Sequence, residues 1–425
     1  MKFLAVLFFN FAAFGVLAQT DSVVQQTESS SPLLGALSTS KTIHPTAALA
    51  LKPDSATSVE KRFLHKNSVT GRQIEFIAGK SKSVVKYGAR VQTRFDAKRL
   101  MNGSENNGFS RDMYVRRARV KADGYLFNPR VGFKFEADVL GGQILDAVLK
   151  YNFIGNFTLW AGQTKLPGNR ERVISSANLQ LVDRSLLNKK YNIDRDLGLQ
   201  LRHHFNIGEF VVREILSVSR GEGKNFSNNK EGVSHEGYGY TGRLEFLPFG
   251  KFSGKGDYSG SDLAREKTPK LSVGVSFDYN DNAIRAQGQR GDLLSRPTDL
   301  SSWYVDAMFK YNGFSFMGEY TTRSTSEVSP IVSQTSDGDL ETFYVGTGLN
   351  MQVGYLFKNN WEIAGRYTFI DPQDEIRSNE ITEYTLGLSK YIIGHKVKAQ
   401  TDISYQKEEA EQEALIYRLQ LELSF

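Results

Sequence analysis

Alternation of apolar and polar side chains, sustained from about residue 82 to the last residue, is the feature that most constrains the fold. In 131–139, for example, Val131, Phe133 and Phe135 alternate with Gly132 and Lys134. Side chains of a strand point to opposite faces in turn, so such segments have one apolar and one polar face. The pattern predicts a chain built of β-strands.

About sixteen segments alternate in this way, and a strand that crosses a membrane needs only about 9–11 residues. The available length therefore leaves room for a loop or turn after every strand. The expected strands start near residues 84, 113, 130, 144, 156, 196, 209, 237, 270, 302, 313, 342, 360, 382, 395 and 413.

The connections between these segments alternate between short and long, which is the plan of an outer-membrane barrel with short turns at one rim and long loops at the other. The connection at about 248–269 is an exception, since it is long on the short-turn side, and the pattern gives no physical account of it. Short turns are expected at 128–129, 155–156, 206–208, 312–313, 358–360 and 394–395, and long loops at 97–112, 166–195, 220–236, 281–301 and 324–341.

Two other classes of protein fit less well. A helical membrane protein needs several apolar runs of about 20 residues, and only the extreme N-terminus approaches one. Soluble β-sandwiches would also show alternation, but they need no long and short loops in turn. The last strand favours the membrane barrel, because the terminal Phe425 ends an apolar face and resembles the assembly signal of outer-membrane barrels.

The first 80 residues differ from the rest. Residues 1–18 combine a basic start, an apolar stretch and small residues before Gln19, which is typical of a cleaved secretory signal peptide. Residues 19–80 are rich in polar residues without a sustained period, which predicts a flexible extension. The barrel domain is expected over 81–425, in the bacterial outer membrane.

A barrel of this size normally encloses water, so its inward charges decide what passes. The alternation places Arg117, Arg119 and Lys121 on the lumen wall, and the long 166–195 loop with its flanks is rich in basic residues. Rings of Arg and Lys favour anions and phosphate, although nearby acids would pair with some of these groups. The predicted anion path has the three wall residues and, around the loop, Lys165, Arg170, Arg172, Arg184 and Arg195.

The stretch from 156 to 202 resembles the phosphate-selective porin O and P family in a set of ordered motifs. Flanking motifs extend the resemblance over most of the predicted barrel, among them Arg116-Arg117-Ala118-Arg119. The central motifs read Gly162-Gln163-Thr164-Lys165-Leu166-Pro167-Gly168-Asn169, Glu171-Arg172, Ser175-Ser176, Asp183-Arg184-Ser185 and Arg195-Asp196-Leu197-Gly198.

This resemblance implies an all-β, transmembrane antiparallel β-barrel with an inward-folded constriction loop, which is 166–195 here, assembled as a homotrimer in lipid. The expected cargo is small anions, phosphate-like oxyanions among them. The sequence departs from the family pattern at Thr164, Gly168 and Asn169, where the loop begins, and at Asp183. A general, weakly selective porin therefore stays as an alternative, and an adhesin or structural barrel as a further one.

The sequence contains few residues that would support catalysis or metal binding. Cysteine is absent and only six histidines are present, so no metal site is predicted. His203 and His204 are adjacent on a predicted strand and face opposite sides. No catalytic residues, no cofactor and no nucleic-acid partner are expected.

Overall fold

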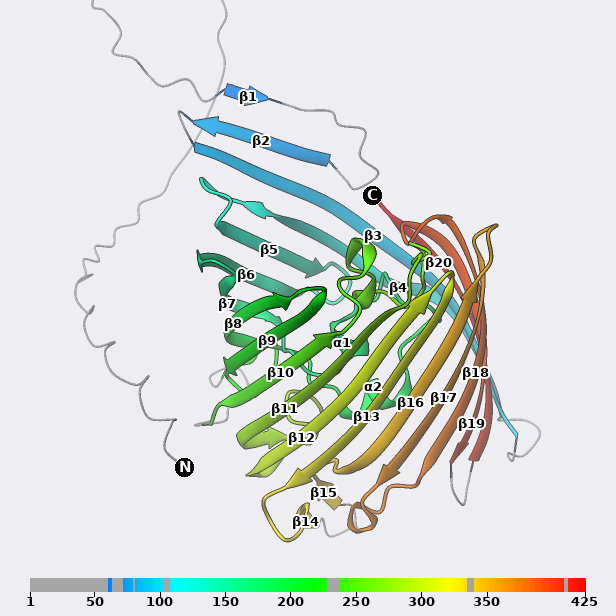
Figure 1. Ribbon diagram of the computed structural model, residues 1–425. Helices are drawn as coiled ribbons and strands as arrows, with labels where there is room; N and C mark the ends of the chain where they lie inside the picture. Colours follow the sequence, from blue (N-terminus) through cyan, green and yellow to red (C-terminus); the bar gives the residue numbers. More distant parts are fainter. Residues whose placement is uncertain are drawn as a thin grey trace, which may run out of the picture. The chain divides into compact units, whose positions relative to one another are not determined.

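The computed structural model describes residues 60–62, 72–78, 81–101, 108–227, 237–334, 340–408 and 412–425. In these ranges sixteen antiparallel strands form a barrel (Figure 1). The last strand, β20 (Gln412–Ser424), pairs with the first, β3 (Ser81–Leu100), so the sheet closes on itself. Closure satisfies the backbone hydrogen-bonding groups that an open edge would leave exposed in lipid.

The strands between these two follow one another around the barrel, and each pairs with its neighbour in sequence. A small separate hairpin, β14 (Ile331–Gln334) and β15 (Leu340–Thr342), lies in one loop. The other barrel strands are β4 (Phe109–Tyr125), β5 (Val131–Asp138), β6 (Gln143–Ile154), β7 (Phe157–Lys165), β8 (Arg195–Ile207), β9 (Phe210–Ser219), β10 (Gly239–Leu247), β11 (Lys270–Arg285), β12 (Leu293–Tyr311), β13 (Phe314–Thr325), β16 (Gly346–Leu356), β17 (Trp361–Pro372), β18 (Ile381–Ile393) and β19 (Val397–Glu408).

Exposure of side chains is inverted relative to a soluble protein. On β20, Leu421 is 55% exposed while the neighbouring Glu422 is 3% exposed, and the same alternation is clear on strands such as β16 and β18. Apolar side chains therefore face outward and polar ones face the lumen, as in a barrel surrounded by lipid. This arrangement confirms the predicted barrel and excludes the soluble sandwich.

The short turns lie where the sequence predicts them. The turn between β12 and β13 uses Asn312 and Gly313, both with positive φ, of 48° and 89°. This conformation matches the twist of a hairpin and favours Asn-Gly. The predicted turn positions are therefore confirmed, because the local chemistry of Gly and Asn marks them.

Several predicted loops are shorter than expected because the strands extend beyond the membrane-spanning length. The expected 281–301 loop is wrong in its bounds: β11 and β12 continue through it and leave only 286–292 between them. Their pairing survives two register shifts, between Asn280 and Ala283 and between Ala283 and Arg285. β-Bulges absorb the extra residues, whereas the broken alternation suggested a loop.

The N-terminal extension is not wholly irregular. Strands β1 (Glu60–Arg62) and β2 (Arg72–Ala78) lie in the last part of the segment predicted as flexible, and β2 pairs with the start of β3. Along β3, pairing with β2 reaches Tyr87. From Ala89 onward the β3 backbone pairs with the C-terminal end of the chain, beginning at Phe425. The predicted signal peptide 1–18 and the extension up to residue 59 lie outside the described residues.

Helical structure is sparse. The described ranges contain two short α-helices, α1 (Arg170–Val173) and α2 (Leu186–Tyr191), and two 3₁₀ segments, η1 (Ser253–Tyr258) and η2 (Asp374–Ile376). None of the described helices has the length and apolar character needed to cross a membrane. Figure 1 places α1 and α2 inside the ring of strands.

Candidate functional site

Segment 166–195, here called the constriction loop, leaves the wall after β7 and rejoins it at β8, and it carries both α-helices. Ser185 is the N-cap of α2, and its Oγ accepts a hydrogen bond from the Asn188 backbone N at 3.1 Å. Serine at this position satisfies a free N–H group of the first turn. The predicted inward fold of this loop is confirmed.

Arg170 fastens the loop to the opposite wall. Its Nε donates to Asp306 Oδ1 on β12 at 2.6 Å, and an Nη atom donates to Ser272 Oγ on β11 at 2.9 Å. One residue later, the Glu171 backbone N donates to Glu319 Oε1 on β13 at 2.5 Å. Arg170 is fully buried, so this contact is a structural latch.

Asp183 fastens the loop to the wall on the side of β3 and β4. Its carboxylate lies 2.8 Å from an Nη atom of Arg94, 3.5 Å from Arg117 and 3.8 Å from Arg116. Burial alone would raise the pKa of Asp183, but Arg117 and Arg94 outweigh it and hold that pKa well below its usual value. The loop is therefore held by a carboxylate that stays ionised.

Apolar packing fills the space between the loop and the strands opposite β4–β8. Ile174 and Leu179 of the loop are buried with side chains of β9, β10, β12 and β13. A packed cluster of this kind excludes water. The remaining members of the cluster are Val211, Leu247, Phe252, Met308 and Met317.

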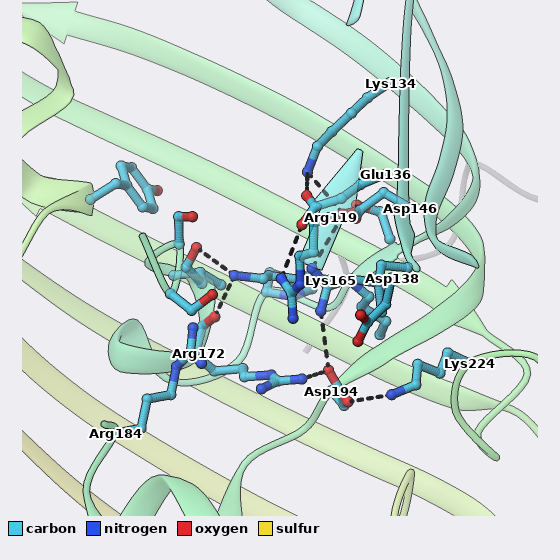
Figure 2. Close-up of a pocket in the computed structure, with 18 of the residues that line it drawn as sticks. Arg119, Lys134, Glu136, Asp138, Asp146, Lys165, Arg172, Arg184, Asp194 and Lys224 are labelled. Atoms are coloured by element: carbon cyan, nitrogen blue, oxygen red, sulfur yellow. Dashed lines mark hydrogen bonds and ion pairs between the residues drawn. The ribbon is translucent and has the colours of Figure 1, made fainter. Parts of the chain in front are cut away.

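A cavity of about 420 Å³ stays open between the loop and β4–β8 (Figure 2). Among the residues that the structure describes, twelve basic and four acidic side chains line it. The basic ones are Arg116, Arg117, Arg119, Lys134, Lys165, Arg172, Arg184, Arg195, Arg202, Lys224, Arg243 and Arg290, and the acidic ones are Glu136, Asp138, Asp146 and Asp194.

Wall acids neutralise part of this charge. Lys134 Nζ lies 2.9 Å from Asp146 and 3.5 Å from Glu136, and Arg119 lies 3.0 Å from Glu136. Arg195 also reaches Asp146, at 3.2 Å. Figure 2 shows Arg119 and Lys134 meeting at Glu136.

Asp194 is the acidic residue of the constriction loop that lines the cavity. It pairs with Arg172, and it lies 3.7 Å from Arg195 and 3.8 Å from Lys224 (Figure 2). One carboxylate thus serves three cations, so positive charge exceeds negative charge around it.

Four cations of the cavity have no carboxylate within 4.0 Å in the described part of the chain: Lys165, Arg184, Arg202 and Arg290. Lys165 Nζ donates to the backbone O of Arg172 at 2.7 Å. Arg184 donates to backbone oxygens of the loop, and Arg202 donates to Gln200 Oε1 at 2.7 Å. Neutral acceptors therefore orient Lys165, Arg184 and Arg202 without supplying an opposite charge.

Cations of the constriction loop repel Lys224, which follows β9. Burial first, and then the positive charges of Arg172 and Arg195, lower the pKa of Lys224 to about 8. Burial lowers the pKa of Arg184 to about 10 despite the attraction of Glu171. An anion in the cavity would relieve this repulsion by supplying the missing opposite charge.

A second cavity of about 220 Å³ adjoins the first on the side of the C-terminus, and Arg119, Lys134, Glu136 and Ser175 line both. Lys121 and Lys396 also line it. Basic side chains therefore continue along the β4–β5 wall beyond the constriction loop.

Comparison with known proteins supplies the family. The family model for "Phosphate-selective porin O and P" matches residues 85–423, which is nearly the whole barrel. The chain belongs to this family. It is therefore a porin of the bacterial outer membrane, a barrel whose lumen is a channel rather than an enzyme site.

Relatives and solved structures agree with this fold. An uncharacterized protein of Aquifex aeolicus is 24% identical over 299 residues, which are 66% of this porin and 67% of that protein. Two solved structures are 10% identical: a loop-deletion mutant of the outer membrane protein OmpT of Vibrio cholerae and an anion-selective porin from Comamonas acidovorans. Their TM-scores are 0.51 and 0.50; the matches cover 80% and 81% of this porin, and 99% and 100% of those chains.

The predicted anion-path residues divide into three groups in this porin. Lys121 lines the second cavity, and Arg170 lines neither cavity because the latch to Asp306 buries it. The prediction of Arg170 as a pore residue is therefore corrected. The other six line the larger cavity: Arg117, Arg119, Lys165, Arg172, Arg184 and Arg195.

Sequence reasoning missed several lining residues. Lys224 follows β9 and Arg290 lies between β11 and β12; both line the cavity, and no sequence motif marks either of them. Lys134 and Arg202 lie on inward positions of β5 and β8. The alternation does assign this second pair to the polar face, but the predicted anion path left both residues out.

The departures from the family pattern have structural explanations. Gly168 packs so closely that an added Cβ would lie 2.3 Å from Ile193 Cγ1. Asn169 is the N-cap position of α1 and donates to Glu319 at 3.4 Å, while Thr164 donates to Asp146 at 2.8 Å. Gly168 and Asn169 therefore fit the packing and contacts at the start of the loop, and Thr164 lines the larger cavity while it is hydrogen-bonded to a wall acid.

Proposed function

We propose that this porin conducts small anions by passive diffusion, with phosphate and related oxyanions as the preferred class. The observation that carries the proposal is the excess of basic over acidic side chains around the larger cavity, twelve against four in the described residues. The four cations without a carboxylate partner provide the attraction: Lys165, Arg184, Arg202 and Arg290.

The expected mechanism is electrostatic. Low-dielectric walls focus the positive field along the lumen and raise the local concentration of anions. Guanidinium groups offer planar pairs of donors to oxyanions, and several such groups in succession let an anion exchange partners without a tight site. Binding that is strong enough for entry and weak enough for release is what conduction requires.

A weakly selective general porin is the second candidate. The observation that favours it is the pairing of wall cations with acids, such as Arg119 with Glu136 at 3.0 Å and Arg117 with Asp183 at 3.5 Å. Such pairs contribute little net field. The unpaired cations favour the anion channel, because their charge acts on the lumen without local cancellation.

We also propose that the porin assembles as a homotrimer in the outer membrane, as the family resemblance implies. Cross-linking of the purified protein in detergent would give a three-subunit band. A monomer under all mild conditions would contradict this assembly.

Single-channel recording in a planar bilayer tests the conduction proposal. Reversal potentials in a potassium chloride gradient should report anion preference, and phosphate should block chloride current at sub-millimolar concentration. The variant Arg290→Gln should weaken the phosphate block, while Arg111→Gln, an exposed position outside the cavity, should not. A larger, weakly selective current that ignores phosphate would support the general porin, and no current would favour an adhesin or structural barrel.

A further inference from the structure

Segment 248–269, here called the inner turn, is the long connection on the rim of short turns. It joins β10 to β11 and contains η1. The predicted anion path does not include it. Its contacts show that it occupies the lumen beside the constriction loop.

A lumen-facing lysine of β12 holds the backbone of the inner turn. Lys310 is 1% exposed, and its Nζ donates to the backbone O of Gly256 at 2.8 Å, of Ser259 at 2.9 Å and of Ser261 at 2.6 Å. Three acceptors match the three donors of an ammonium group. The turn is therefore fixed to the wall from within the barrel.

The inner turn also contacts the constriction loop directly. The Gly260 backbone N donates to the Asn178 backbone O at 2.8 Å, and an Nη atom of Arg170 donates to the Asp257 backbone O at 3.1 Å. A Cβ at Gly260 would lie 2.8 Å from the Gln180 backbone N. The two segments therefore approach so closely that only glycine fits at the contact.

Phe252 extends this contact into the apolar cluster. It is buried in the cluster that contains Ile174 and Leu179 of the constriction loop. The inner turn and the loop thus fill the same part of the lumen, in front of β10, β12 and β13.

The turn also covers carboxylates of that wall. The Tyr258 hydroxyl donates to Glu245 Oε2 at 2.9 Å, and Asp257 pairs with Arg213, which itself lies 3.1 Å from Glu245. Glu245 is fully buried, whereas Tyr258 lines the larger cavity. The Tyr258 hydroxyl therefore satisfies an acid of the β10 wall on the side of the cavity, and Arg243, 2.9 Å away, pairs with the same acid within the wall.

We propose that the inner turn is a second specificity-determining element of this channel. Together with the constriction loop it closes the lumen in front of β10–β13, screens Glu245, and confines permeating anions to the basic wall of β4–β8. The effect of the inner turn on conductance follows from its filling of the lumen in front of β10–β13. Its effect on selectivity rests on the anion-conduction proposal.

The test compares three variants with the native channel by single-channel conductance and reversal potential. Deletion of 252–267 removes the turn, Gly260→Val separates it from the constriction loop, and Tyr258→Phe removes only the hydroxyl group that contacts Glu245. Lys267→Gln, an exposed position on the same turn, is the matched control.

Deletion is expected to raise conductance at least about twofold and to lower anion preference, because a second route opens along a wall with exposed carboxylates. Gly260→Val, like the deletion, should raise conductance and lower anion preference. Tyr258→Phe should lower anion preference with unchanged conductance. If the deletion variant does not assemble, the two point variants carry the test.

Unchanged conductance in both the deletion and Gly260→Val would overturn the inference. A native channel without anion preference would contradict the proposed function instead, and a rise in conductance on deletion would then still support the inner turn as a constriction. The two failures are therefore distinguishable.

Discussion

The two halves of the lumen use the same residue types for different purposes. In the filled half, in front of β10–β20, Arg170 pairs with Asp306 at 2.6 Å, and so does Arg243 at 2.7 Å, at the border with the cavity that it also lines. In the open half, along β4–β8, Arg184 and Arg202 meet neutral acceptors and keep their charge available. We therefore expect an arginine of this barrel to act on stability where a carboxylate saturates it, and on the field in the lumen where none does.

Burial is the second difference between the halves. The latch around Asp306 is closed to solvent, so its strength depends on complete pairing. The other half keeps an open cavity, so we expect its cations to act through a weak, additive field. Disruption of the filled half should change stability, and disruption of the open half should change selectivity.

The largest effect is expected from Asp306→Ala, which leaves Arg170 and Arg243 buried without their shared partner. Removal of one member of a buried ion pair costs about 3–5 kcal/mol. Urea unfolding of the detergent-solubilised barrel should report this loss, and Glu375→Ala at an exposed position should leave the midpoint unchanged. Equal midpoints for both variants would contradict the structural role of the latch.

The next effect concerns the open half. A unit charge about 8 Å from a permeating anion contributes about 0.5 kcal/mol in water and repels a cation by the same amount, so the double variant Arg184→Gln with Arg202→Gln should lower the anion-to-cation permeability ratio at least about fivefold. Reversal potentials measure this ratio, with Arg111→Gln as the control. A native ratio in the double variant would show that these cations do not act on the pore.

A smaller effect should follow from pH, because the pKa of Lys224 lies at about 8. Lysine is charged below its pKa, so a rise from pH 7 to pH 9 removes most of one positive charge and should lower anion preference about twofold. In Lys224→Gln the preference should be lower at pH 7 and the change with pH should disappear. Persistence of the same pH dependence would assign it to another group.

The smallest effect is predicted for a neutral exchange, Arg119→Gln with Glu136→Gln. This pair, separated by 3.0 Å, has no net charge, so its loss should change selectivity by less than about 0.2 kcal/mol. The single variant Arg119→Gln should change selectivity more, because it leaves Glu136 facing the cavity. Equal losses in the single and double variants would instead place Arg119 in direct contact with the anion.

Much of the fold follows from the sequence because period-two alternation is a local property of each strand. The predicted starts near 130, 144, 156 and 270 fall within one residue of β5, β6, β7 and β11. The predicted bounds of the loop between β11 and β12 were wrong, because a bulge changes the phase of the alternation without ending the pairing. The same alternation placed Arg117 and Arg119 on the lumen wall, where the structure has them.

The sequence by itself determined the barrel, its turns and the location of basic residues, since strand periodicity and turn chemistry are set by neighbours along the chain. Only the tertiary structure decided which cations face the cavity. Arg170 and Arg184 lie in the same loop, yet only Arg170 meets a carboxylate from the far wall. The position of the inner turn could not be predicted from the sequence either. Lys310 and Gly260 contact segments about fifty to eighty residues away in the chain, which only the folded barrel brings together.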